Sequence, residues 1–342
     1  MTNSDADPCL FYCTTEGQKL IVALYVDDGL VETQSDVVLE NFLTDLKSQF
    51  CVTVSSASCF LGLQISRLAD GSVTVCQENY TKRILQKFNM FECNKVATPI
   101  DKSHADRESS VELNERVPYR EAVGTLIYLA VCTRPDIAFA VSVVSQALDR
   151  PTKADWERVK RLFKYLKGTA HLCIVYRADQ QAGILLTYSD ADYAGDLKTR
   201  RSTSGVVCKY MGGAVSWLSQ RQKSVALSTT EAEFMAASEA AKEIVWLSRL
   251  FAEITSLPNL PVLLMDNLSD VKLSKNPAFH KRSKHIEVRH YFVREKIDEG
   301  KLVVEHVPGT EQIADILTKP LATIRFQDLR LGLGLMSVSD VV

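Results

Sequence analysis

The pattern of apolar and polar positions in residues 1–95 predicts a small unit of two hairpins and two helices. The first apolar run continues through Asp27-Asp28-Gly29, a sequence typical of a tight turn between two strands. Apolar residues then recur at helical spacing, with Ser35 as the expected N-cap. The expected elements are a hairpin over 20–31, a helix over 36–49, a hairpin over 60–67 and 72–76, and a helix over 79–90.

The middle of the chain changes to a helical pattern. Residues 96–118 combine prolines with many charges and few apolar residues, which is typical of a linker. Further on, Pro135 suits the first position of a helix and Gly168 suits a helix end. The expected helices cover 123–132, 136–148 and 153–167.

The rest of the chain shows short β-rich runs, one long amphipathic helix and then alternating strands and helices. This order predicts a mixed five-stranded sheet flanked by helices, hence an α/β fold class, or α+β for the whole chain. The expected elements are strands over 184–189, 205–210 and 214–219, a helix over 230–254, a strand over 262–265, helices over 267–274 and 287–299, a strand over 302–306 and a helix over 311–317.

Composition places the chain among ordinary globular proteins. It has 342 residues, of which 46% are hydrophobic and 24% charged, and this length is enough for about two domains. The formal net charge is only -2, from 40 basic and 42 acidic residues. The chain is therefore not a polycation, and any contact with nucleic acid must use local basic patches.

Cysteine usage and the N-terminal sequence predict the compartment. The nine cysteines are odd in number and irregularly spaced, which favours neither a disulfide framework nor a cysteine zinc site. Residues 1–7 are polar and unlike a signal peptide, and no apolar run approaches the roughly 18 residues of a membrane span. We expect a soluble intracellular protein, cytoplasmic or nuclear, that is not secreted and has no membrane partner.

Four acidic residues stand where the expected strands end or helices begin. Asp190 follows the first strand of the expected sheet, Glu233 lies early in the long helix, Asp266 follows the fourth strand, and Asp315 lies in the last helix. Carboxylates gathered at one sheet edge repel each other unless a cation is bound, and two Mg²⁺ or Mn²⁺ ions about 4 Å apart could support phosphodiester hydrolysis. The alternative is that each residue only forms a turn or a helix cap.

Two ordered sets of sequence motifs run through the chain. The set in its second half is YSDADYAGD (188–196), RRSTSG (200–205), AVSWLSQRQKSVALSTTEAEFMA (214–236), LLMDN (263–267), KHIEVRHYFVRE (284–295) and EQIADILTKPL (311–321). The set in its first half is LYVDDGLV (24–31), FLGLQI (60–65), ATPID (97–101), YREAVGTLIYLAVCTRPDIAFAV (119–141) and YLKGT (165–169). The later set resembles the ribonuclease H domain of copia-type LTR retrotransposon Pol polyproteins, and the earlier set resembles the end of the reverse transcriptase and its connection in the same family.

This resemblance implies a division of the chain into parts. It implies a truncated reverse transcriptase palm and thumb remnant, a linker with a helical connection, a ribonuclease H-like domain and a C-terminal tail. The expected boundaries of these parts are 1–95, 96–175, 176–330 and 331–342.

The resemblance also implies roles for individual residues of the ribonuclease H-like part. The catalytic and metal-binding tetrad of the family falls on Asp190, Glu233, Asp266 and Asp315, and His306 is the candidate for proton or ion handling. Asp192 and Glu231 remain alternatives to Asp190 and Glu233, because each lies two residues away. His306 could equally be an ordinary solvent-facing side chain.

The polymerase signature of the family falls on Tyr25, Val26, Asp27 and Asp28. In the family the two aspartates hold metal ions at a hairpin tip, together with a third carboxylate from a separate strand. No credible counterpart of that third carboxylate precedes Asp27 in this sequence. We therefore expect a C-terminal Pol fragment whose reverse transcriptase part is inactive alone.

Two groups of basic residues are candidates for contact with nucleic-acid phosphates, although each could be a solvated charge run. The first group, near Asp190, is Lys198, Arg200 and Arg201, and the second is Lys281, Arg282, Lys284 and His285. The resulting hypothesis is an RNA/DNA-hybrid ribonuclease that uses two Mg²⁺ or Mn²⁺ ions, with the remainder of a Pol polyprotein as a candidate partner. The alternative hypothesis is a catalytically idle remnant or a co-opted nucleic-acid-binding protein.

Overall fold

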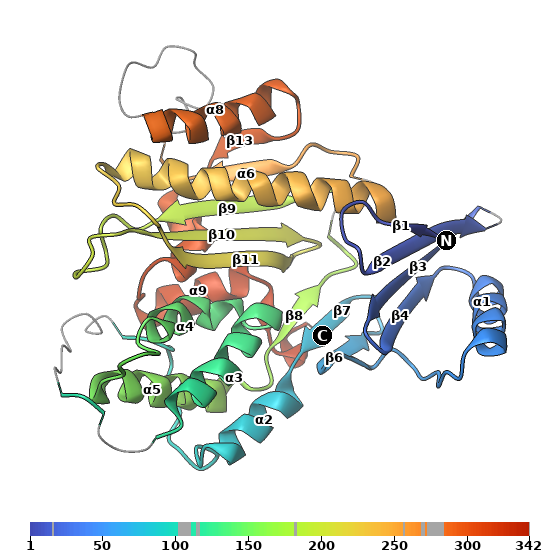
Figure 1. Ribbon diagram of the computed structural model, residues 1–342, viewed down its shortest axis with the longest axis horizontal. Coiled ribbons are helices and arrows are strands. Elements are labelled where there is room, and N and C mark those ends of the chain that lie inside the picture. The colour runs from blue at the N-terminus through green and yellow to red at the C-terminus, as the bar shows by residue number, and fades with distance from the viewer. Residues whose placement is uncertain are drawn as a thin grey trace.

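The strands of the protein form three sheets, which are laid out in Figure 1. The computed structural model describes residues 1–15, 17–101, 111–113, 117–180, 183–255, 257–267, 271 and 284–341, and at 15 and 284–287 it describes the backbone only. One sheet has four strands and the other two have five each. The mixed α/β class expected from the sequence is confirmed.

The first sheet is antiparallel and contains the hairpin expected over 20–31. Strands β3 (Gln18–Tyr25) and β4 (Asp28–Thr33) form this hairpin, and helix α1 (Asp36–Gln49) begins at Ser35, whose side chain accepts a hydrogen bond from the Val38 N–H. Two further strands, which were not expected from the sequence, extend the sheet; residues 10–15 are β-prone but lack a clear alternation of apolar and polar positions. These are β1 (Thr2–Asn3) and β2 (Leu10–Thr15).

The second sheet joins three distant parts of the chain. It contains the second expected hairpin, and strand β8 pairs on one side with β7 and on the other with the edge strand β14. The sequence pattern predicted neither β8 nor β14, and β14 comes from the residues expected as a C-terminal tail. Strand pairing therefore crosses the boundary expected at residue 95. In sheet order the strands are β14 (Leu335–Met336), β8 (Cys173–Tyr176), β7 (Val73–Cys76), β6 (Leu63–Arg67) and β5 (Cys59–Phe60).

The helices expected between these sheets are present, with some different ends. The helix expected over 79–90 ends at Lys87, because Asn89 adopts a left-handed backbone conformation with φ 55°. Gly168 was expected at a helix end but lies within a helix. The elements are α2 (Glu78–Lys87), α3 (Tyr119–Cys132), the 3₁₀ helix η2 (Pro135–Ile137), α4 (Ala138–Ser145) and α5 (Lys153–Thr169).

The third sheet is the mixed five-stranded sheet expected from the sequence. Its order is β11-β10-β9-β12-β13, with antiparallel pairing among the first three strands and parallel pairing of β12 with both neighbours. We call it the central sheet. Its strands are β9 (Leu186–Ala191), β10 (Thr203–Tyr210), β11 (Gly213–Arg221), β12 (Val262–Met265) and β13 (Val303–His306).

Helices lie on both faces of the central sheet (Figure 1). The prediction of one helix over 311–317 was wrong, because extended backbone at Gln312 divides the segment into two 3₁₀ helices. The helix expected over 267–274 falls mostly outside the described residues. No described helix combines the length and apolar character that crossing a membrane requires. The elements are α6 (Thr229–Ile254), α8 (Lys284–Asp298), η3 (Gly309–Glu311), η4 (Ile313–Leu317), α9 (Thr323–Gly332) and η5 (Val338–Asp340).

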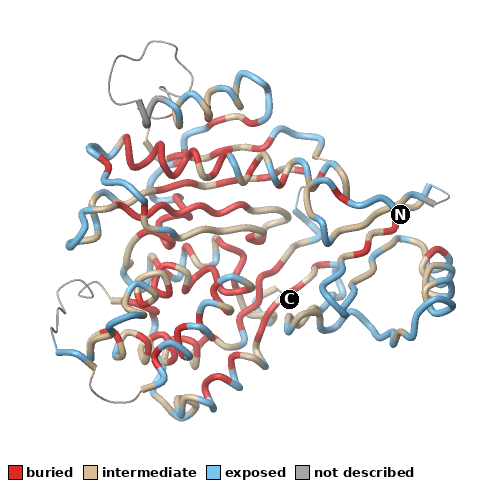
Figure 2. The backbone as a smooth tube through the Cα atoms, viewed as in Figure 1, coloured by how far each residue is buried: buried red, intermediate tan, exposed pale blue. Residues whose placement is uncertain are grey.

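Two hydrophobic cores lie on opposite faces of the central sheet. Along β10, Val207 belongs to the core shared with α3, α4, α5 and η4, whereas Val206 and Cys208 belong to the core under α6 and α8. This alternation is the period of two that a strand imposes on its side chains. The first core also contains Ile84 and Leu335, so it joins residues that are distant in the sequence. Figure 2 shows that buried segments line both sides of the central sheet.

A buried ion pair fixes the helical region next to this core. The Arg134 guanidinium donates to both carboxylate oxygens of Asp136, at 2.9 and 2.8 Å, and to the carbonyl and hydroxyl oxygens of Thr169. Tyr165 donates a further hydrogen bond to Asp136. Both charged side chains are almost inaccessible to solvent, at 2% and 0% exposed, so each depends on the other for compensation of its charge.

We expect Asp136→Ala to destabilise the protein by about 3 kcal/mol, because the substitution leaves the Arg134 charge buried without its carboxylate. The measurement is urea denaturation of the full chain. Asp149→Ala is the control: its ion pair with Arg120 joins side chains that are 95% and 72% exposed, so little change is expected. Equal effects of the two substitutions would contradict the role assigned to the buried pair.

Candidate active site

Asp190 is placed at the edge of the central sheet by strand β9. It is the penultimate residue of that strand and is only 3% exposed. The Thr318 hydroxyl donates a 2.5 Å hydrogen bond to its Oδ2 atom. Next to it, the Ser189 carbonyl accepts a hydrogen bond from the buried Gln312 side chain. The segment around η4 therefore holds this end of β9 in place.

Glu233 faces Asp190 from the first turns of α6. Its Oε1 atom accepts a 3.3 Å hydrogen bond from the backbone N–H of Ala191. Glu231, the alternative considered from the sequence, accepts a hydrogen bond from the Leu227 N–H at 2.6 Å, just before the helix. Its own N–H donates to the N-cap Ser228. Glu231 thus caps the helix start.

Asp192, the alternative to Asp190, has a different contact. It accepts a backbone hydrogen bond from Thr203, and its own N–H donates to the Thr203 carbonyl at 3.1 Å. These bonds close the end of the β9–β10 ladder. Burial raises the pKa of Asp192 to about 6, against the opposing effect of the Thr203 hydrogen bond.

Asp266 comes directly after β12, which lies beside β9 in the sheet. His306 ends the neighbouring strand β13, and its Nε2 atom lies 3.1 Å from the Asp266 carbonyl oxygen. The His306 side chain is exposed and contacts the backbone of Asp266 at the rim of the site.

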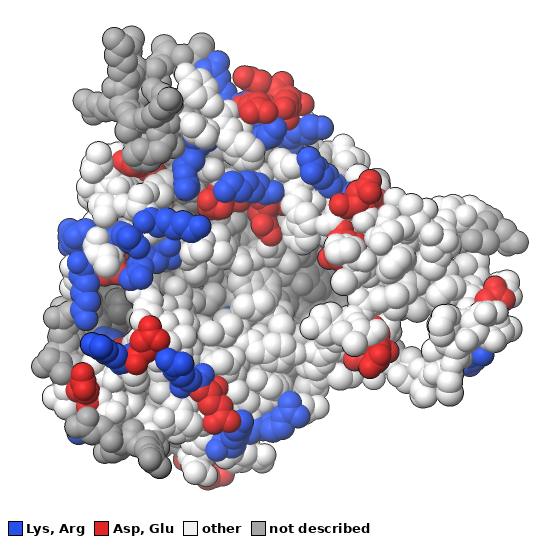
Figure 3. Space-filling model, in the orientation of Figure 1, with Lys and Arg blue, Asp and Glu red and all other residues white. Residues whose placement is uncertain are grey.

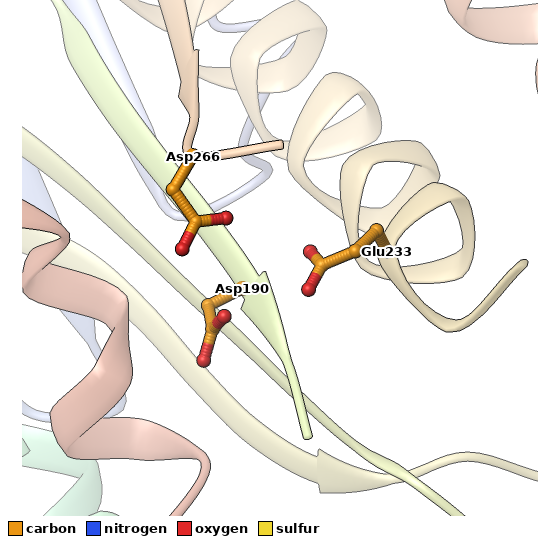
Figure 4. A group of neighbouring side chains, drawn as sticks. All are labelled: Asp190, Glu233 and Asp266. Carbon is orange, nitrogen blue, oxygen red and sulfur yellow. The ribbon is translucent and has the colours of Figure 1, made fainter. Parts of the chain in front are cut away.

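Three of the four expected carboxylates come together. Among the described residues, Asp190, Glu233 and Asp266 each offer an oxygen, and these oxygens lie within 4.8 Å of one another. Figure 4 shows the three side chains pointing toward a common space from β9, α6 and the end of β12. Three carboxylate oxygens at this spacing are a suitable ligand set for a hard divalent cation.

Asp315 lies at the side of this group and is held by two cations. Its Oδ1 atom is 2.5 Å from Lys319 Nζ, and its Oδ2 atom is 3.4 Å from the Arg325 guanidinium. Lys319 Nζ is also 3.9 Å from Asp190 Oδ2, so the ammonium lies between two of the expected carboxylates. Lys319 was not expected from the sequence. Its position four residues after Asp315, within ADILTKPL, is the pattern that could have indicated an ion pair.

The electrostatics of the site follow from burial and crowding of like charges. Burial raises the pKa of Asp190 to about 7, with repulsion from Asp315 and Asp266 adding to the effect, while Lys319 and Thr318 oppose it. Burial also raises the pKa of Asp266, and Asp315 adds repulsion there as well. The site therefore favours any cation that can share these oxygens.

The structure describes only some of the residues that were expected to bind phosphate. Lys198 and Arg200 are exposed and Arg201 is half-buried in the β9–β10 connection, where Asp196 accepts backbone hydrogen bonds from Lys198 and Thr199. Figure 3 shows Lys and Arg side chains gathered over this part of the molecule. Lys281 and Arg282 lie outside the described residues, and Lys284 and His285 are described only as the backbone that begins α8.

The polymerase signature lies in the first sheet. Tyr25 ends β3, Val26 and Asp27 form the turn, and Asp28 begins β4; all four side chains are exposed. Within the described part of the chain, the group of potential metal ligands contains neither aspartate. The expectation that this part is inactive alone remains a prediction.

Comparison with known proteins gives a reverse transcriptase match and transposon relatives. The family model for reverse transcriptase (RNA-dependent DNA polymerase) matches residues 2–102. The chain is 39% identical over 332 residues to a retrovirus-related Pol polyprotein from transposon TNT 1-94 of Nicotiana tabacum, covering 94% of this chain and 25% of that protein. It is 35% identical over 339 residues to the Pol polyprotein from transposon RE2 of Arabidopsis thaliana, covering 98% and 23%.

A third relative is matched over most of its own length. The putative transposon Ty5-1 protein of Saccharomyces cerevisiae is 30% identical over 238 residues, which are 69% of this chain and 77% of that protein. In contrast, the chain spans about a quarter of the length of the two plant Pol polyproteins.

Two solved structures match parts of the chain at low sequence identity. LC11-RNase H1, isolated from compost by a metagenomic approach, has a TM-score of 0.33 and 18% identity, covering 40% of this chain and 93% of that one. The foamy viral protease-reverse transcriptase in complex with double-stranded DNA has a TM-score of 0.46 and 11% identity, covering 84% and 46%. The transposon relatives, together with the reverse transcriptase model, show that the chain belongs to the copia-type retrotransposon Pol family.

Proposed function

We propose that the carboxylate site of the central sheet hydrolyses the RNA strand of an RNA/DNA hybrid, as a ribonuclease H. The observation that supports this proposal is the convergence of Asp190, Glu233 and Asp266 within 4.8 Å. If each carboxylate only formed a turn or capped a helix, there would be no reason for the three side chains to lie close together. Family membership supports a nucleic acid as the substrate, and the exposed basic residues beside the site fit a phosphate backbone.

The donor set fits Mg²⁺ or Mn²⁺. Asp190, Glu233 and Asp266 would hold an ion, and Asp315 is the fourth ligand of the two-ion tetrad that the family likeness implies. When bound, such ions supply Lewis acidity to a phosphodiester and make hydroxide available near neutral pH.

The other residues orient and neutralise this ligand set. The Thr318 hydroxyl fixes one Asp190 oxygen, and the Ala191 N–H fixes one Glu233 oxygen. His306 is exposed at the rim, next to the Asp266 backbone, where it could exchange a proton with solvent or with a departing product. We further propose that the protein works inside the cell, with the remainder of a Pol polyprotein as a partner.

We expect Asp266→Asn to lower hybrid cleavage at least about a hundredfold, because one charged metal ligand becomes neutral. The assay is Mg²⁺-dependent cleavage of a labelled RNA/DNA hybrid, with single-stranded RNA as the substrate control. Asp328→Asn makes the same chemical change at an exposed position of α9 and should leave the rate unchanged. Hybrid binding without cleavage by the unmodified protein would instead favour an idle, nucleic-acid-binding remnant.

We expect Asp190→Asn to stabilise the metal-free protein at neutral pH by about 1 to 3 kcal/mol, because it removes a buried charge from the repelling group. The folded-state pKa of Asp190, about 7, lies above its ordinary value of 3.8, so this carboxylate costs stability as pH rises through that interval. Urea denaturation in EDTA should therefore show a larger difference between variant and unmodified protein at pH 8 than at pH 5.

Metal addition completes this test. At pH 8, Mg²⁺ should raise the unfolding midpoint of the unmodified protein and have much less effect on Asp190→Asn, because the variant lacks a ligand charge. A difference between the two proteins that does not change with pH would count against the burial argument. So would equal stabilisation of both by Mg²⁺.

A further inference from the structure

Lys319 is a cation within the carboxylate group. It follows η4, and its ammonium lies 2.5 Å from Asp315 Oδ1 and 3.9 Å from Asp190 Oδ2. The electrostatic effect of Lys319 also reaches Asp266, whose pKa it acts to lower against burial and the repulsion from Asp315. One ammonium therefore neutralises part of the charge of three of the four expected carboxylates.

The second cation on Asp315 has a different kind of environment. The Arg325 guanidinium donates to the backbone carbonyls of Gly309, Thr310 and Gln312 as well as contacting Asp315. These bonds attach α9 to η3 and to Gln312 after it, so Arg325 cannot move away without losing hydrogen bonds to three backbone carbonyls. Arg325 is a fixed part of the fold.

The Lys319 side chain, in contrast, is partly open to solvent. It is 43% exposed, and its two ion-pair partners are both expected metal ligands. A lysine has a long flexible stem and a compact ammonium, so it can turn toward solvent without disturbing the backbone. A divalent ion that used Asp315 and Asp190 would need the oxygens that Lys319 now contacts.

We propose that Lys319 is a resident counter-cation that competes with a divalent metal ion for Asp315 and Asp190. The inference rests on the proposed function, because it concerns the same metal ligands. Lys319 then acts as a positioning residue in two ways. It holds the two carboxylates together against their repulsion, and it sets the metal concentration at which the Asp315 side of the site fills.

The simpler alternative is an ordinary ion pair between residues four positions apart. Solvent-exposed pairs at this spacing contribute little to stability, and water screens their effect on neighbouring charges. The Lys319 pair differs, because the Asp315 side chain is only 12% exposed. The two views differ in one measurable quantity, the affinity for a divalent cation after the ammonium is removed. Competition for the oxygens predicts clearly tighter binding, whereas a solvent-screened pair predicts little change.

The test is Mn²⁺ binding to the full chain, followed by electron paramagnetic resonance of the free ion. We expect Lys319→Met to lower the dissociation constant of the weaker Mn²⁺ site about tenfold, the factor that corresponds to 1.4 kcal/mol. Lys242→Met is the matched control, because Lys242 contacts Glu239 at 3.0 Å on the middle of α6. It should leave both Mn²⁺ sites unchanged.

A double variant identifies the carboxylate through which Lys319 acts. In Asp315→Asn the ammonium has lost its nearest partner, so adding Lys319→Met should produce little further gain in Mn²⁺ affinity. Thermal melting of each variant, with and without Mn²⁺, verifies that it is folded. Unchanged or weaker Mn²⁺ binding in folded Lys319→Met would overturn the proposal, and so would the lack of a second Mn²⁺ in every variant.

This measurement separates the inference from the proposed function, since it needs no nucleic acid. If the unmodified protein does not cleave hybrid but Lys319→Met binds Mn²⁺ more tightly, the ribonuclease proposal fails and the competition stands. If hybrid is cleaved and Mn²⁺ affinity does not change, the competition fails and the ribonuclease proposal stands.

Discussion

The alternation of side chains along the central sheet is the constraint on which the rest of the structure depends. Val206 and Cys208 point into the core under α6, and Val207 points into the core shared with the helical region. A shift of one residue in the pairing of β10 would turn each of these side chains to the opposite face of the sheet. Each core would then lose the side chains that now fill it. The register in turn fixes where β9 ends, and so places Asp190 at the sheet edge.

The same packing makes it possible to hold like charges together. Burial of the charged Asp190 side chain beside Asp315 and Asp266 opposes folding. The same burial and repulsion raise the pKa of Asp190. Thr318 and Lys319 reduce the cost locally, and the two cores on either face of the sheet supply the remaining stability. A site that is unfavourable by itself but held by a well-packed scaffold is ready to bind a cation with little rearrangement.

Sequence reasoning predicted the central sheet well because strands and helices there are long and periodic. The pattern placed Asp190, Glu233 and Asp266 at one edge of the sheet. It could not exclude the carboxylates two residues away, because their hydrogen bonds are not visible in a sequence. Asp192 bonds the Thr203 backbone and Glu231 caps the start of α6. Strands β8 and β14 were missed because they are short and their partners lie far away in sequence.

The missed strands change how the parts of the chain relate to one another. Strand β8 pairs with β7 on one side and β14 on the other, so the reverse transcriptase-like part and the end of the chain share a sheet. Beside it, the Tyr176 hydroxyl donates to the Ala214 carbonyl at the start of β11, which belongs to the central sheet. The Trp217 indole of β11 donates to the Ala130 carbonyl of α3. Hydrogen bonds therefore connect the carboxylate-bearing sheet to both preceding parts. A displacement of the sheet that contains β7 and β8 would therefore move the central sheet at β11. Strand β11 lies on one side of β10, and β9 with Asp190 lies on the other.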